Sequence, residues 1–184
     1  MWPFAHTCHA GCPYCFSGKG VAGEVANGAR WWTDDEAVTA WRNVYDRYGP
    51  CYILLSGLEP GEQLELVGRV FEYHYAGMAT NFTFDIDDFR RLIKPDHIEL
   101  HPTFHPHLWG MDPAPFCARV KSLQEDGYNI PLASLVAYPP YIPRLDEYAA
   151  ALAEVVGTVN VAPARLCTYQ GKPYPESYTE DELA

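Results

Sequence analysis

Six short apolar runs alternate with amphipathic segments along this chain, and this alternation limits the possible folds more than any other feature. The apolar runs span residues 2–7, 51–56, 77–83, 97–101, 129–137 and 158–161, and the segments with helical periodicity span 33–48, 62–75, 85–93, 112–126 and 145–156. Regular strand–helix alternation predicts an α/β fold with a parallel sheet and right-handed crossovers. Six units are fewer than the eight of a closed barrel, so an open partial barrel and a doubly wound sheet both fit.

Local signals support these boundaries. Thr33, followed by three acidic residues, predicts a helix N-terminus, and Gly127 and Gly157 stand just past two predicted helix ends. The continuous apolar run 51–56 predicts a strand that is buried on both faces. Residues 17–30 are rich in small residues and predict a long loop. We expect one domain over residues 1–165 and an extended C-terminal tail over 166–184.

Composition excludes several classes of protein. The chain has 184 residues, 48% of them hydrophobic, which is enough for one folded domain, and its net charge is −11. Such an acidic chain is poorly suited to nucleic acids or membrane surfaces, which favour clustered Lys and Arg. The sequence contains no apolar run of about 18 residues and no secretory signal at its start. The uneven grouping of the six cysteines argues against disulfides, so we expect a reducing, cytoplasmic location.

Three cysteines near the start form the motif most indicative of chemistry. Cys8, Cys12 and Cys15 lie within eight residues, and three thiolates can hold three corners of an iron–sulfur cube, leaving the fourth iron open. The same cysteines could instead bind zinc together with His6 or His9. A ferredoxin-like site would need a fourth cysteine, and none lies nearby.

Other polar segments are expected beside this loop. In parallel folds, ligands bind at the carboxyl ends of the strands. The segment from Ser56 to Pro60 follows the second predicted strand, Thr80 and Asn81 lie towards the end of the third, and the segment from His101 to His107 follows the fourth. We expect these segments and the cysteine loop to converge on one rim.

These motifs together resemble the radical S-adenosylmethionine (SAM) superfamily. The spacing Cys8-x3-Cys12-x2-Cys15, with an aromatic residue at Tyr14, is similar to the cluster loop of that family. The run Ser56-Gly57-Leu58-Glu59-Pro60 resembles its Gly-Gly-Glu-Pro segment, with Leu58 in place of the second glycine. Thr80-Asn81 resembles its Thr-Asn pair, and Glu99 stands where many members have a serine. The resemblance covers roughly residues 1–165.

The resemblance implies a fold, two cofactors and a reaction. The fold would be a partial (β/α)6 barrel, with a [4Fe–4S] cluster on Cys8, Cys12 and Cys15 and SAM on the open iron. The enzyme would be an oxygen-sensitive oxidoreductase that receives an electron from a donor such as a flavodoxin or ferredoxin. Cleavage of SAM would give a 5′-deoxyadenosyl radical that abstracts hydrogen from a small molecule, a peptide or a protein.

The resemblance also assigns roles to individual residues. Glu59, after the Gly57 turn, would bind the ammonium group of SAM. Thr80 and Asn81 suit the methionine carboxylate or the ribose, and Glu99 suits the ribose hydroxyls. Tyr14 would cover the cluster and the adenine, and Val136 would line the adenine pocket. Each of these residues also has a purely structural interpretation, as a core, helix-start or strand-end residue.

Weaker candidates and other functions remain open. His101 could contact the substrate, Arg165 could hold an anion, and Cys167 could donate a hydrogen or an electron. His101, His105 and His107 could form a second metal site, although a polar loop is the simpler interpretation. An auxiliary cluster is not expected, because Cys167 is the only cysteine after the sixth strand. Alternatives to the leading hypothesis are a glycyl-radical activase, a non-catalytic iron–sulfur or SAM-binding protein, and a zinc-binding domain.

Overall fold

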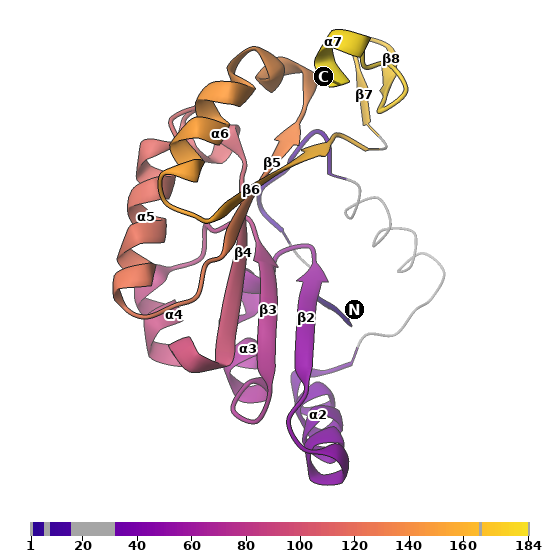
Figure 1. Ribbon diagram of the computed structural model, residues 1–184. Coiled ribbons are helices and arrows are strands. Elements are labelled where there is room, and N and C mark those ends of the chain that lie inside the picture. The colour runs from indigo at the N-terminus through magenta and orange to yellow at the C-terminus, as the bar shows by residue number, and fades with distance from the viewer. Residues whose placement is uncertain (1, 6–7, 16–31, 166, 184) are drawn as a thin grey trace.

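A parallel sheet of six strands forms the centre of the computed structural model, which describes residues 2–5, 8–15, 32–165 and 167–183 (Figure 1). The strands are β1 (Trp2–Ala5), β2 (Tyr52–Gly57), β3 (Tyr75–Thr80), β4 (Ile98–Phe104), β5 (Leu132–Ala137) and β6 (Thr158–Pro163). Their order in the sheet is their order in the chain, and each pair is parallel. The sheet is therefore wound in one direction, and the doubly wound alternative is wrong because its strand order reverses at a switch point.

Helices follow the strands on one face of this sheet. They are α2 (Asp34–Tyr48), α3 (Leu64–Val70), α4 (Ile86–Leu92), α5 (Ala114–Glu125) and α6 (Leu145–Ala153). Figure 1 shows α3, α4, α5 and α6 gathered on the same side, as right-handed crossovers between neighbouring strands require. Short 3-10 helices precede several of these elements, and each starts at a proline: η1 (Pro60–Gln63), η2 (Pro95–His97), η3 (Pro106–Trp109) and η4 (Pro139–Arg144).

Helix α2 begins and docks as its sequence predicts. The Thr33 side chain accepts a hydrogen bond from the Glu36 backbone N–H, and the Glu36 carboxylate accepts one from the Thr33 N–H at 2.8 Å, which makes a capping box. An ion pair of 2.7 Å between Arg69 and Asp35 joins α2 to α3. Buried His74 joins it to β2, since Nδ1 accepts from the Cys51 N–H and Nε2 donates to the Trp41 carbonyl.

The hydrophobic core lies between the helices and the sheet. Fully buried strand residues such as Leu55, Met78 and Leu100 point into it. The residues that alternate with them face the other side, which carries none of the described helices. Tyr52 and Leu54 are accordingly 59% and 38% exposed. The prediction that the run 51–56 is buried on both faces is therefore wrong, because the helices that the structure describes cover one face only.

Several element boundaries differ from those predicted. The helix predicted over 62–75 is split into η1 and the shorter α3, and Tyr75 already begins β3. Strand β3 ends at Thr80, three residues early, because side chains capture the next backbone donors: Thr80 Oγ1 accepts from the Phe82 N–H, and Asn81 Oδ1 from the Thr83 N–H. Strand β4 continues to Phe104, so His101 lies inside the strand and not after it.

The C-terminal segment is folded, so the prediction of an extended tail is wrong. It contains an antiparallel hairpin of β7 (Cys167–Tyr169) and β8 (Lys172–Tyr174), followed by the short helix α7 (Glu180–Leu183). Gln170 and Gly171, both with positive φ, make the two-residue turn. The Tyr178 hydroxyl donates to the Ala137 carbonyl and accepts from the Ala164 N–H, which holds this segment at the carboxyl ends of β5 and β6.

Two further predictions concern a long loop and membrane-spanning helices. The loop predicted over 17–30 lies outside the described residues. Among the helices that the structure describes, none has both the length and the apolar composition needed to cross a membrane.

Candidate functional site

The cysteine loop lies next to the segments that follow β2, β3 and β4. Cys8, Cys12 and Cys15 form no disulfide and are half-buried, while Ala10 and Tyr14 between them are buried. Gly11 adopts a positive φ of 56°, and the Cys15 N–H donates to the Cys12 carbonyl at 3.0 Å. The hydrogen bond closes a four-residue turn over residues 12–15, and the positive φ of Gly11 turns the chain just before it.

Side chains directly after β3 and β4 contact two of these sulfur atoms. The Asn81 side-chain amide donates to Cys8 Sγ at 3.7 Å, and His105 Nδ1 lies 3.8 Å from Cys12 Sγ. Burial, followed by the proximity of Cys15 and Cys8, raises the pKa of Cys12 to about 12. Burial likewise raises the pKa of Cys8. Thiolates so close together and partly desolvated are costly without a cation, and a bound metal would supply one.

Glu59 is a buried carboxylate held by three hydrogen-bond donors. Its side chain is 1% exposed; Oε1 accepts from the Gly61 N–H at 2.8 Å and from the Thr80 hydroxyl at 2.6 Å, and Oε2 accepts from the Asn81 N–H at 2.5 Å. Among the described residues, no Lys, Arg or His side chain contacts it. Burial raises the pKa of Glu59, and the three hydrogen bonds offset this only in part. A buried carboxylate without a cation is suited to receive one.

Two glycines allow this arrangement. Gly57, at the end of β2, has a φ of 138°, which other residues rarely adopt, and it turns the chain towards Glu59. At Gly61, a Cβ atom would lie 2.7 Å from the Glu59 carboxylate and 2.8 Å from the Phe84 ring. Sequence reasoning identified Gly57 but missed Gly61, although the Pro-Gly pair directly after Glu59 marks a turn.

Aromatic rings surround Tyr14 beside the cysteine loop. The Tyr14 hydroxyl lies 2.8 Å from His105 Nδ1, and its ring packs against Tyr138 with a centroid separation of 5.0 Å. His107 Nε2 lies 3.1 Å from the Ala10 carbonyl, and its Nδ1 lies 3.1 Å from the Tyr141 hydroxyl. Burial and the neighbouring His107 lower the pKa of His105 to about 4, so His105 is neutral at physiological pH. His105 and His107 thus support the cysteine loop, which the interpretation as a polar rim loop missed.

Glu99 and His101 form a separate cluster on the side of the sheet that carries none of the described helices. His101 Nε2 lies 2.6 Å from Glu99 Oε1. Glu99 Oε2 accepts from the Asn129 amide at 2.8 Å, and the Tyr52 hydroxyl donates to Oε1 at 3.4 Å. The Glu99 carboxylate is thus occupied by neighbours of its own.

The remaining candidates are placed elsewhere. Val136 is half-buried on β5, on the same side of the sheet as Glu99. Arg165 is exposed. Cys167 is 3% exposed and lies in β7 beside Tyr138 and Tyr178.

The cysteines do not form a site for a single metal ion. Within the described residues, no group of three or more His, Cys, Asp or Glu side chains is placed to hold one ion, and this holds for the histidines of 101–107 as well. The ligands of an iron–sulfur cube bind different irons and need not converge on one point. The positions of the three cysteines in space therefore argue against a preformed zinc site more than against an iron–sulfur cube. His6, one of the two histidines considered as a zinc ligand, lies outside the described residues.

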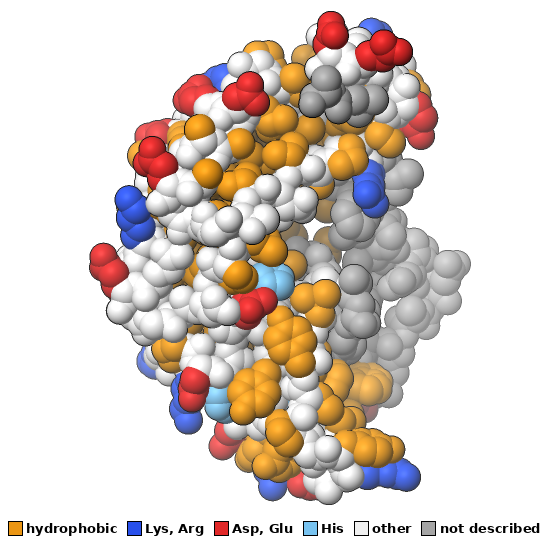
Figure 2. All heavy atoms as spheres, in the orientation of Figure 1, with side chains coloured by type: hydrophobic (Ala, Val, Ile, Leu, Met, Phe, Trp, Pro, Cys, Tyr) orange, Lys and Arg blue, Asp and Glu red, His pale blue; other side chains and the backbone are white. Residues whose placement is uncertain are grey.

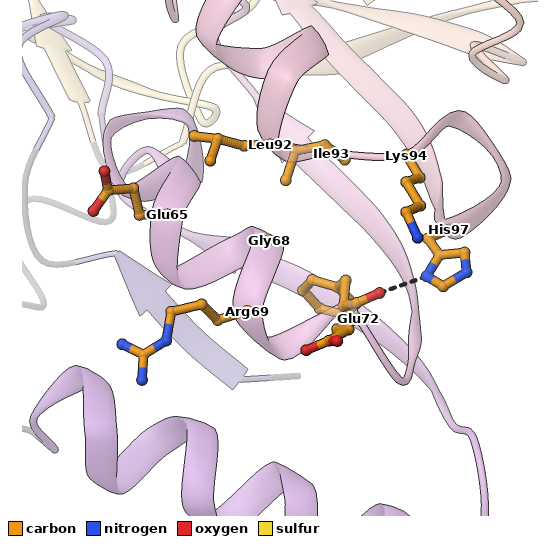
Figure 3. Close-up of a pocket in the computed structure, with 9 residues that line it drawn as sticks. Glu65, Gly68, Arg69, Glu72, Leu92, Ile93, Lys94 and His97 are labelled. Atoms are coloured by element: carbon orange, nitrogen blue, oxygen red, sulfur yellow. Dashed lines mark hydrogen bonds between the residues drawn. The ribbon is translucent and has the colours of Figure 1, made fainter.

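A cavity of about 440 Å³ lies at the other end of the sheet, in the helix layer (Figure 3). Glu65 and Arg69 of α3, Leu92 of α4, and Lys94 and His97 around η2 line it. Since η2 leads into the start of β4, this cavity lies at the amino ends of the strands. It contains none of the cysteines and none of the residues around Glu59.

Comparisons with known proteins add no identity to this geometry. No protein-family model matches the chain, and no curated protein matches it.

Proposed function

We propose that the protein is a radical SAM enzyme with a partial (β/α)6 barrel. The observation that carries the proposal is the environment of Glu59. Its buried carboxylate has three hydrogen-bond donors and no cationic partner among the described residues. Asn81 connects it to the cysteine loop, because Asn81 hydrogen-bonds to both Glu59 and Cys8. The one-directional winding of the sheet, with helices on one face, is what a partial barrel requires.

Each group at this site has a distinct task in the proposal. Cys8, Cys12 and Cys15 would hold a [4Fe–4S] cluster, and Glu59 would bind the ammonium group of SAM. Thr80 donates to Glu59 and so orients the carboxylate, while Asn81 links Glu59 to Cys8. The buried rings of Tyr14 and Tyr138 exclude water beside the loop. When bound, these two cofactors would supply the reductive cleavage of SAM into methionine and a 5′-deoxyadenosyl radical, with the electron coming from a flavodoxin or ferredoxin.

Anaerobic reconstitution tests the proposal. Protein loaded with iron and sulfide is expected to contain about four irons and four sulfides per chain and to form 5′-deoxyadenosine from SAM and dithionite. Cys12→Ala should abolish the product, whereas Cys51→Ala, remote from the loop, should not. One zinc per chain without sulfide would overturn the proposal in favour of a zinc domain. An intact cluster that binds SAM without cleaving it would instead indicate a non-catalytic protein.

The Glu59→Gln variant tests the proposed role of the buried Glu59 carboxylate directly. Loss of the negative charge should weaken SAM binding roughly ten- to a hundredfold, because a charge-assisted hydrogen bond is lost, while iron content stays unchanged. Glu65→Gln, on the exposed side of α3, is the matched control and should bind SAM as the wild type does. Equal SAM affinity in the wild type and Glu59→Gln would remove Glu59 from the site.

A further inference from the structure

The side of the sheet opposite the helices carries a built polar cluster that lies outside the cysteine–Glu59 site. We call this side the inner face. Alternate residues of strands β2 to β6 lie on it: Tyr52, Leu54 and Ser56 of β2; Tyr75, Gly77 and Ala79 of β3; Glu99, His101 and Thr103 of β4; Leu132, Ser134 and Val136 of β5; and Thr158, Asn160 and Ala162 of β6. The Glu99 carboxylate lies near its centre. Residues from three segments donate to it, namely His101, Asn129 and Tyr52.

This cluster fixes the hydrogen-bonding role of His101. An ionised carboxylate can only accept, so the nitrogen 2.6 Å from Glu99, Nε2, carries the proton. In the neutral ring Nδ1 is then an acceptor, and no described residue hydrogen-bonds to it. Ala79, the neighbour of His101 in register on β3, is small and exposed, which leaves room beside the ring. A carboxylate that orients a histidine in this way is a common device for presenting its other nitrogen to a ligand.

Exposed aromatic rings lie on the same face. Tyr52 and Tyr75 are paired in register and are 59% and 47% exposed. A Cβ atom at Gly77 would lie 2.3 Å from the Tyr52 hydroxyl, so glycine there is what lets the Tyr52 side chain lie across β3 towards Glu99. Figure 2 shows hydrophobic side chains gathered on this side of the molecule around a carboxylate and a histidine. Exposed rings of this kind stack on the flat face of a ligand.

The charge of the inner face restricts what it can bind. Among the inner-face residues named above, Glu99 is the one with a charged carboxylate, and none is Lys or Arg. The carboxylate repels an anion and attracts a cation, while Nδ1 of His101 can accept a hydrogen bond from a donor on the ligand. An uncharged or cationic ligand with a hydroxyl or amine group therefore fits better than a carboxylate or a phosphate.

We propose that the inner face is the substrate-binding surface and that the substrate is an uncharged or cationic molecule with a flat ring and a hydroxyl or amine donor. The donor hydrogen-bonds to Nδ1 of His101, the ring packs against Tyr52 and Tyr75, and Glu99 positions His101 and selects against anions. The identification of this ligand as the substrate rests on the function proposed above, whereas its binding is measurable without SAM cleavage.

Three small probes that differ in charge test this selectivity on the full-length protein. Tyramine, tyrosol and para-hydroxyphenylacetate share a phenol ring and are cationic, neutral and anionic, respectively. Their affinities can be measured by ligand-observed NMR at about pH 8. We expect tyramine to bind at least about tenfold more tightly than para-hydroxyphenylacetate, with tyrosol between them.

Variants separate the two recognition elements. His101→Gln keeps a donor for Glu99 but loses the Nδ1 acceptor, and it should weaken all three probes by about tenfold. Glu99→Gln should abolish the preference for tyramine over para-hydroxyphenylacetate. Glu125→Gln, exposed at the end of α5, is the matched control and should leave every affinity unchanged.

The outcomes distinguish this inference from the proposed function. Probe binding with the expected charge order, without any 5′-deoxyadenosine from SAM, supports the inner-face site and overturns the radical SAM proposal. Three results would overturn the inner-face inference alone if 5′-deoxyadenosine still forms. They are equal affinities for the three probes, affinities that His101→Gln does not change, and the absence of any probe binding.

Discussion

At the scale of single residues, the Thr80 hydroxyl connects Glu59 of the candidate site to the backbone after β3. Its hydroxyl donates to Glu59 at 2.6 Å and accepts from the Phe82 N–H at 2.9 Å, and Phe82 has an unusual positive φ. Thr80→Val keeps the shape but leaves the Phe82 N–H unpaired and removes one of the three donors to Glu59, so we expect a loss of about 2 kcal/mol in urea unfolding and weaker SAM binding. Thr80→Ser keeps the hydroxyl and should lose less stability. Equal losses in the two variants would contradict this account.

The protonation of Glu59 gives a second prediction at this scale. Burial raises its pKa above the ordinary value of 4.5. The folded state therefore holds the proton more tightly than the unfolded state, and this contribution to stability is present below the ordinary pKa and is lost as pH rises through the raised value. In ligand-free protein, the wild type should lose stability relative to Glu59→Gln as pH rises from about 4.5. Urea unfolding of both proteins over a pH series measures the difference, and parallel curves would refute it.

At the scale of elements, Gly68 and Gly77 each allow a neighbouring group to lie close to the backbone. A Cβ atom at Gly68 would lie 2.8 Å from the Leu92 carbonyl, so Gly68 permits the close approach of α3 to the end of α4. Gly68→Ala should cost about 1–2 kcal/mol net, because overpacking against backbone outweighs a gain in helix propensity of about 1 kcal/mol. Gly77→Ala meets the tip of the Tyr52 side chain, which can rotate away, and should cost less. Urea unfolding orders the two variants, and the reverse order would contradict this interpretation.

Element boundaries also show where sequence patterns stop being informative. The start of α2 was predictable because its signal is local: the capping box needs only Thr33 and Glu36. The end of β3 was not predictable. There the side chains of Thr80 and Asn81 accept hydrogen bonds from the next backbone N–H groups, which ends the strand. The burial of 51–56 was misjudged for another reason. Apolar composition at Leu54 does not reveal whether a helix covers it, which depends on the path of the whole chain.

At the scale of the whole molecule, a sheet wound in one direction brings the candidate residues together. Residues 21 to 73 positions apart, at Cys8, Glu59 and the neighbouring pair Thr80 and Asn81, meet because parallel strands place every following loop at the same edge. This convergence could be anticipated from strand order. The pairing of Glu99 with Asn129 could not, because it depends on an isolated bridge between the strand and a loop. The support of the cysteine loop by His105 was equally hidden, since it is a contact over 93 residues.

The C-terminal segment provides the last prediction, since it closes the same edge of the sheet. The Tyr178 hydroxyl joins the Ala137 carbonyl at the end of β5 to the Ala164 N–H after β6. Tyr178→Phe leaves both backbone groups unpaired, and because this cost falls on a small appended segment, the segment should open locally while the sheet stays folded. Trypsin should then cleave faster after Arg165, and the buried thiol of Cys167 should react faster with a thiol reagent.

Tyr169→Phe is the matched control for this opening. Its hydroxyl receives only the exposed Gln170 amide at 3.2 Å, and the ring contact with Tyr138, at 5.6 Å, does not depend on that hydroxyl. Mass spectrometry of timed digests should therefore find wild-type cleavage in Tyr169→Phe and faster cleavage in Tyr178→Phe, with the midpoint of urea unfolding unchanged in the control. Because Tyr138 also packs against Tyr14, an opened segment should loosen the cysteine loop as well. Equal digestion of the two variants would show that the segment is held by ring packing and not by the Tyr178 hydroxyl.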